Sequence, residues 1–159
     1  MTAAPGAYAQ ILVLAGQTRS AVDTNLIIAD GWPASLGPAM FGVGSDRPPP
    51  DSSGTEIQST QEYVGQSPYK VDEEISIPCW IYYAAGGTDE ASPRTKAYAA
   101  YSDFFTRIRA DLTLGGALVD GNNYARIDSL TLEGPKSQQE ASDGRYALLM
   151  FTVICGNRY

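Results

Sequence analysis

The stretch Val71–Tyr83, VDEEISIPCWIYY, constrains the fold more than any other part of the chain. Every second residue in it is apolar except Glu73, and this alternation is typical of a strand with one buried face. Pro78 lacks a backbone N–H group and predicts an edge or a bulge at that point. The opposite face ends with Trp80 and Tyr82. Two aromatic residues on an outer face indicate a surface for contact with another protein.

Further strands are predicted in the rest of the chain. Tyr146–Cys155, YALLMFTVIC, is apolar on both faces, which is typical of a central strand that is covered on each side. Tyr124–Glu133 alternates moderately, and Ala39–Ser45 is expected to form a short strand. A single domain of this size covers the second face of its sheet poorly. We therefore expect that another copy of the protein covers that face.

A long helix is predicted over Ser92–Leu112, because Ser92 suits the N-cap and Pro93 suits the first helical position. Apolar residues recur there at intervals of three or four and form one stripe. The stripe consists of Ala97, Tyr101, Phe104, Phe105, Ile108 and Leu112. Gly115 and Gly116 then provide the positive φ with which helices commonly end.

A shorter helix is expected near the N-terminus, because Ala7–Asp30 has a loosely helical pattern. Gly16 and the polar residues QTRS that follow it weaken this pattern, and a cluster of Pro and Gly ends it. Its apolar part lacks a preceding basic residue and is shorter than a membrane span of about 20 residues. It is therefore expected to pack on a soluble domain made in the cytoplasm.

The order of these elements predicts one α+β domain over residues 1–159. It consists of a mostly antiparallel β-sheet, with one long and one shorter α-helix packed on one face. A Pro-rich loop over residues 46–55 is expected to leave the domain surface. The polar loops Asp46–Thr55, Ala85–Ala91 and Gly134–Gly144 are the candidate segments for contact with partners.

The composition disfavours several classes of function. The net charge is -7, so most of the surface is expected to repel nucleic acid. The chain has no histidine, which excludes Ser-His-Asp and Cys-His catalysis. Cys79 and Cys155 are too few for a disulfide scaffold or a zinc site. We interpret them as buried thiols, with one disulfide as the alternative if their strands are neighbours, and we expect no metal and no cofactor.

The end of the long helix carries an Arg-x-Asp-x-Thr-Leu-Gly-Gly motif. Its residues are Arg109, Asp111, Thr113, Leu114, Gly115 and Gly116. Before it come the strand with an acidic start and the helix, and after it come a strand, a polar loop and a last apolar strand that ends near an Arg. In this order the region Val71–Tyr159 resembles the tail terminator (tail completion) proteins of siphovirus-type bacteriophages, especially those that infect actinobacteria.

The resemblance implies a structural protein and not an enzyme. Such proteins form a homohexameric ring on the last ring of the tail tube, stop its growth and offer a surface to the head-completion or connector protein. The implied location is the neck of the virion, and the host cytoplasm during assembly. DNA is then only cargo that passes through the lumen, and no membrane is involved. In such a ring the sheet faces neighbouring subunits or the lumen, which would explain Trp80 and Tyr82.

Three other interpretations stay open. The chain is a head–tail connector of the stopper or adaptor type, or it is a subunit of the tail tube. The third interpretation is a small acidic hydrolase that uses Asp72 and Glu74, which share one face of the predicted strand. Nothing near these carboxylates in the sequence raises the pKa of one above that of the other, as acid–base catalysis of glycoside hydrolysis requires.

Overall fold

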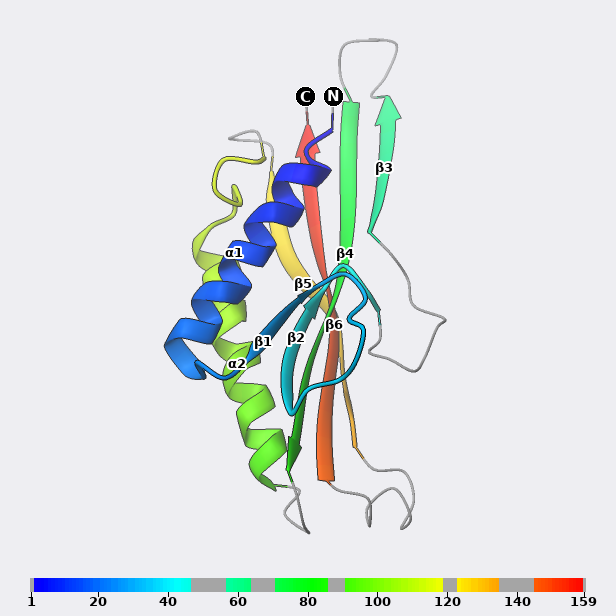
Figure 1. Cartoon of the computed structure of the whole chain (residues 1–159). Coiled ribbons are helices and arrows are strands. Elements are labelled where there is room, and N and C mark those ends of the chain that lie inside the picture. Colours follow the sequence, from blue (N-terminus) through cyan, green and yellow to red (C-terminus); the bar gives the residue numbers. More distant parts are fainter. Residues whose placement is uncertain are drawn as a thin grey trace.

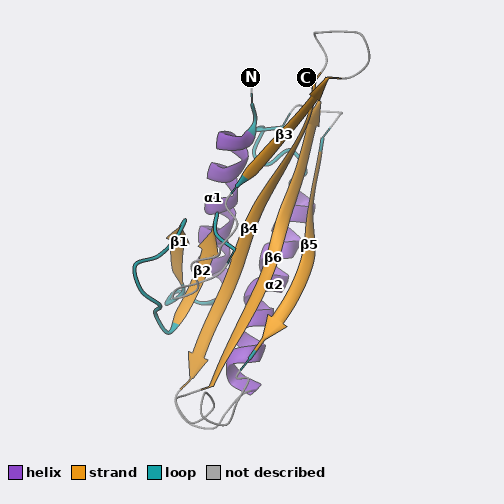
Figure 2. Cartoon of the chain, turned by 90° about the vertical axis from the view of Figure 1, so that its right-hand side faces the viewer, coloured by secondary structure: helices purple, strands orange, loops and turns teal. Residues whose placement is uncertain are grey.

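A computed structural model describes residues 2–46, 57–63, 71–85, 91–118, 123–134 and 145–158. It is an α+β structure in which two helices cover one face of a six-stranded, mostly antiparallel sheet, as predicted (Figures 1 and 2). The elements are α1 (Ala4–Val22), β1 (Ile27–Asp30), β2 (Ala39–Val43), β3 (Gln58–Tyr63), β4 (Val71–Ala85), α2 (Ala91–Ala110), β5 (Tyr124–Glu133) and β6 (Arg145–Arg158). The face under the helices is called the inner face below, and the opposite one the outer face. The three loops proposed for partner contacts lie, apart from their end residues, outside the described residues.

The strand order is β1-β2-β4-β6-β5, and β3 pairs with β4 beside this path. Only β1 and β2 run parallel among these pairs. β6 lies between β4 and β5, which confirms the prediction of a central strand. Along its other side β4 pairs first with β3, up to Ser76, and then with β2, from Cys79. Pro78 lies between these two stretches of pairing, and its carbonyl accepts a hydrogen bond from Gly44 N (2.8 Å). The N–H group that proline lacks is therefore missing at a point between β3 and β2, where no strand partner needs it.

The N-terminal region differs from the prediction. α1 continues through Gly16 to Val22, and it has 19 residues against 20 in α2, so the two helices are almost equal in length. Leu14, Ala15 and Thr18 are buried where α1 packs on α2, β1 and β2, and this packing stabilises a half of the helix that local propensity leaves weak.

The predicted helical region also extends further along the chain than the helix α1 does. Ile27–Asp30, which was expected within the helical region, forms the edge strand β1. The change of structure occurs at Asp23, the C-cap of α1, whose carboxylate accepts a hydrogen bond from Asn25 N (3.0 Å). This local turn ends the helix, although the apolar spacing continues beyond it.

The core lies between the helices and the inner face. Phe41 of β2, Phe104 of α2 and Phe151 of β6 meet there, with ring centroids 5.0 to 6.0 Å apart. The predicted stripe of α2 is buried at Ala97, Phe104 and Ile108, and Ala100 belongs to it as well. Leu112, expected at the end of the stripe, is 49% exposed because the helix ends at Ala110. Within the described residues, neither helix is long and apolar enough to span a membrane.

Both cysteines are buried thiols, as interpreted from the sequence, and they form no disulfide. Their strands are neighbours, but Cys79 pairs with Phe151 while Cys155 pairs with Ile75, so the two sulfurs are in different rows of the sheet. Burial raises the pKa of the Cys155 thiol to about 12 and raises the pKa of Cys79 as well. Both therefore stay protonated and unreactive.

The start of α1 is attached to the sheet through a buried carboxylate. α1 has no side-chain cap of its own at Ala3. Glu73 of β4, which is 2% exposed, accepts hydrogen bonds from Ala3 N (2.9 Å) and from the Thr2 hydroxyl. It also accepts one from the Ser59 hydroxyl of β3 (2.7 Å). The negative charge at a helix N-terminus and these donors explain the one charged residue on the buried face of β4.

Replacing Glu73→Gln should destabilise the fold. The amide keeps the size of the side chain but loses the charge and one acceptor, so we expect the free energy of unfolding to fall by about 1–3 kcal/mol. Urea denaturation measures this change. Glu62→Gln, on an exposed part of β3, is the matched control and should change it by less than about 0.5 kcal/mol. Equal effects of the two substitutions would contradict the role of Glu73.

Candidate functional site

Trp80 does not lie on a free surface, which corrects the prediction for this residue. It points to the outer face but is completely buried there within the chain. Its indole lies over Gly42 of β2, where a Cβ atom would come within 2.1 Å of the ring. The indole Nε1 donates a hydrogen bond to the Ser45 hydroxyl (3.0 Å). Because Gly42 has no side chain, it makes room for Trp80 on the neighbouring strand. The sequence of β4 alone does not indicate this burial.

Trp80 belongs to a small hydrophobic cluster on the outer face. Its other buried members are Ala29, Met40, Leu148 and Met150. Tyr82 and Tyr146 stack beside it, with ring centroids 5.9 Å apart, and both stay partly exposed. This part of the outer face therefore needs no second copy to cover it. Of the two residues proposed for contact, only Tyr82 is accessible to a partner.

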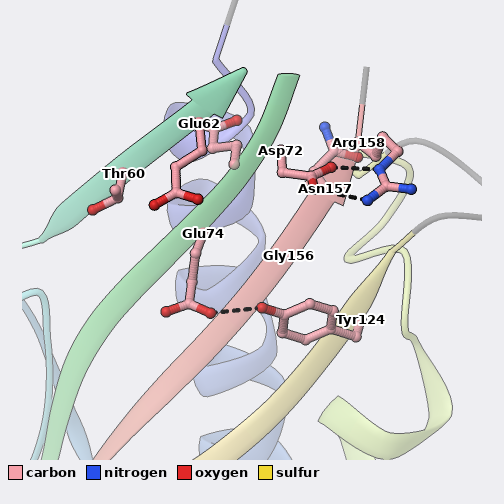
Figure 3. A pocket seen from close by; sticks show the side chains of 9 residues that line it. Thr60, Glu62, Asp72, Glu74, Tyr124, Gly156, Asn157 and Arg158 are labelled. Atoms are coloured by element: carbon pink, nitrogen blue, oxygen red, sulfur yellow. Dashed lines mark hydrogen bonds and ion pairs between the residues drawn. The ribbon is translucent and has the colours of Figure 1, made fainter. Parts of the chain in front are cut away.

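The other end of the outer face is hollowed and acidic (Figure 3). The hollow, called the acidic groove below, has a volume of about 500 Å³. Side chains from four neighbouring strands line it, namely Thr60, Glu62, Asp72, Glu74, Tyr124 and Arg158, together with Glu73, Gly156 and Asn157. The Tyr124 ring lies across Gly156, where a Cβ atom would come within 1.9 Å of it. Gly156 therefore lets Tyr124 form one wall of the groove.

Asp72 and Glu74 both reach the groove, as the alternation of β4 predicts, but they have different partners. Arg158 Nε donates to Asp72 Oδ1 (2.5 Å), and Arg158 Nη2 donates to Asp72 Oδ2 (2.7 Å). This guanidinium holds the pKa of Asp72 below its usual value. Glu74 accepts a hydrogen bond from the Tyr124 hydroxyl (2.8 Å), whose pKa is raised by burial and by Glu74.

This arrangement does not favour acid–base catalysis by the two carboxylates. A general acid needs a raised pKa, whereas Arg158 keeps Asp72 ionised. No group of three or more carboxylate or thiol side chains in the described residues is placed to hold a metal ion. The groove instead offers a fixed negative surface with one aromatic wall.

The Arg-x-Asp-x-Thr-Leu-Gly-Gly motif forms a compact turn after α2. Asp111 organises it, because its carboxylate accepts hydrogen bonds from Thr113 Oγ1 (3.0 Å) and from Gly115 N (2.7 Å). Leu114, at a φ of 47°, is 1% exposed and inserts into the core. Arg109 lies over the Phe105 ring, 5.7 Å from its centroid. The motif therefore forms the turn that ends α2. It is held by Arg109 on the helix side and by Leu114 in the core.

The two glycines of the motif have separate roles. Both adopt positive φ, 65° at Gly115 and 85° at Gly116. A Cβ atom at Gly115 would come within 2.8 Å of the Gln10 side chain, so this glycine also lets the turn pack on α1. At Gly116 a Cβ atom would meet nothing within 4 Å, so only the backbone conformation requires glycine there.

Several groove residues were not predicted from the sequence. Thr60 and Glu62 lie on β3, whose polar sequence QSTQEY shows no apolar alternation. The partners Tyr124 and Arg158 lie far from β4 in sequence, and only the strand pairing brings them to Glu74 and Asp72. No protein-family model and no curated protein matches the chain.

Gly116→Val should lower the stability of the fold. A β-branched residue fits a φ of 85° poorly, so we expect a loss of about 1 kcal/mol or more in the free energy of unfolding. Thermal melting measures the loss. Gly16→Ala is the control, because Gly16 is helical and open, and this change should raise stability by about 0.5–1 kcal/mol. An unchanged melting temperature for Gly116→Val would contradict the backbone requirement.

Arg158→Gln should raise the pKa of Asp72 toward its ordinary value, because the guanidinium that stabilises the carboxylate is lost. Carboxyl NMR titration of both proteins measures this shift. In the natural chain the contribution of the pair to stability is present above about pH 4 and disappears as the pH falls through the lowered pKa of Asp72. Arg107→Gln, which removes the partner of Asp103 on α2, is the control and should leave the pKa of Asp72 unchanged.

Proposed function

We propose that this chain is a tail terminator of a siphovirus-type bacteriophage, a structural protein that forms a ring at the head-proximal end of the tail tube. The observation that carries the proposal is the Arg109–Gly116 motif in its context. Its residues form one defined turn between α2 and β5, and the turn follows the acidic start of β4 and precedes the apolar β6. This is the order in which the resemblance requires them.

The fold supports the proposal, since the resemblance implies a sheet with helices on one side. The same arrangement leaves the outer face without helices (Figure 2). A subunit of a ring can direct such a face toward the lumen and its helices outward. The proposed partners are further copies of the chain, with six in the ring that the resemblance implies, the tail-tube protein and the head-completion or connector protein.

The distribution of charge also supports it. The outer face of the sheet carries the acidic residues Glu62, Asp72, Glu74, Asp128 and Glu133 against the basic residues Arg126 and Arg158. The helices carry Arg19, Arg94, Lys96, Arg107 and Arg109 against Asp103. The acidic groove lies on the outer face. A lumen lined by that face would repel phosphate, so DNA would pass through it without being held.

The proposed location is the neck of the virion, after assembly in the host cytoplasm. Catalysis forms no part of the proposal, because the pKa of Asp72 is lowered where a general acid would need it raised. Membranes are likewise no part of it, and DNA enters only as passing cargo.

The purified protein should bind one end of isolated tail tubes and prevent their further growth. Negative-stain electron microscopy of tubes mixed with gold-labelled protein measures this, with unrelated acidic protein as the control. Label at both ends, or at neither, would contradict termination. Binding to portal-containing heads instead of tubes would indicate a connector, and long filaments of the protein alone would indicate a tube subunit.

A further inference from the structure

β5 forms an edge of the sheet and contains one residue more than regular pairing requires. It ends the strand path, and among the described residues only β6 pairs with it. The register shifts between Asp128 and Thr131, where two residues of β5, Ser129 and Leu130, stand against Phe151 alone. Two residues opposite one define a β-bulge.

The interior of the sheet does not explain this bulge. β4 and β6 pair without a register shift from Asp72 to Ala85. β6 therefore offers β5 a regular ladder, and the extra residue belongs to the edge strand alone.

The sequence of β5 shows which residue is extra. Tyr124–Glu133 reads YARIDSLTLE, and without Ser129 it would read YARIDLTLE. From Ala125 onward this shorter sequence alternates strictly between apolar and polar residues, as a regular strand with one buried face does. Ser129 is the residue that breaks the alternation.

The bulge is unfavourable for the folded chain in two ways. Ser129 adopts a φ of 59°, which residues other than glycine rarely occupy. Leu130 is 43% exposed, whereas in the shorter strand it would stand opposite Phe151, a buried residue of the core. Backbone strain and the lost burial of a leucine both disfavour this conformation. The same strand without Ser129 would have neither disadvantage.

A regular β5 would be an open edge for a further strand. It would present a long row of backbone N–H and C=O groups, and such edges pair with strands of other molecules. A bulge bends its strand, increases the local twist and interrupts this row. At the opposite end of the strand path, β1 has only 4 residues, and a very short edge strand is itself a poor template for pairing.

We propose that the bulge at Ser129 prevents strand addition at β5, so that copies of the chain do not extend one another's sheets at this edge. Contacts at the edge are then limited to side chains. This role follows from the pairing of β5 with β6, so it is independent of the proposed function.

Deletion of Ser129 tests this role, because it gives β5 the residue count of a regular ladder. In sedimentation velocity the variant should form larger assemblies than the natural chain at equal concentration. In hydrogen–deuterium exchange, the β5 amides that do not bond to β6 should exchange about tenfold or more slowly at high than at low protein concentration. Ser129→Gly is the matched control, since glycine permits the positive φ and keeps the bulge. It should match the natural chain in both measurements.

Circular dichroism and thermal melting verify that the deletion variant is folded. Deletion of Leu130 gives the same residue count, and it replaces the first deletion if that variant does not fold. Failure of both deletions to fold would show that the bulge serves the fold itself and would overturn the proposed role. Folded deletion variants that keep the assembly state of the natural chain, or that associate without slower exchange in β5, would overturn it as well. Tube capping by the natural chain tests the proposed function separately.

Discussion

β4 and β6 pair antiparallel from Asp72 and Arg158 at one end to Ala85 and Arg145 at the other, and this ladder positions all other described elements. β2 and β3 share the free side of β4, while β5 pairs with the free side of β6. α2 packs on the inner face of both strands. Apart from the pair Glu73 and Asn157, the inner row of β4 and the part of β6 opposite it are apolar between Ile75 and Tyr83. A shift of β4 by one residue would turn its polar outer row toward the core, so its register is strongly specified.

The parts of the fold that sequence could predict are those in which local pattern and burial agree. β5 has the predicted bounds, and β4, β6 and α2 differ from theirs by a few residues at their ends, because their periodicity is set by the core that they contact. α1 and β1 were predicted less well. The packing of α1 on the sheet outweighs the weak propensity around Gly16, and the turn at Asp23 interrupts an apolar spacing that continues.

For the candidate site, too, sequence predicted the local features and missed those that depend on another strand. The alternation of β4 correctly placed Asp72 and Glu74 on one face, and the glycines after α2 have the expected positive φ. Trp80 lies on the predicted face, but it is buried there and not accessible to a partner, because Gly42 of another strand makes room for it. The hydrogen-bond partners of Asp72 and Glu74 depend on how distant strands pair, and a single sequence does not give that pairing register. Local sequence patterns thus determine the face of a strand on which a side chain lies, whereas strand pairing determines which side chains it contacts.

The outer face combines two different environments. Its middle contains the hydrophobic cluster around Trp80, which the chain buries by itself. One end carries the acidic groove, where Asp72 is fixed by Arg158 and Glu74 by Tyr124. Large exposed apolar residues lie instead near the two lateral edges, Ile27 on β1 and Leu130 and Leu132 on β5. Burial of apolar groups is favourable, whereas burial of ionised groups is costly. Association at the edges would therefore bury apolar side chains and leave the acidic groove in water. Stacking of copies on their outer faces would instead bury Asp72, Glu74 and Glu62, three carboxylates with one guanidinium between them.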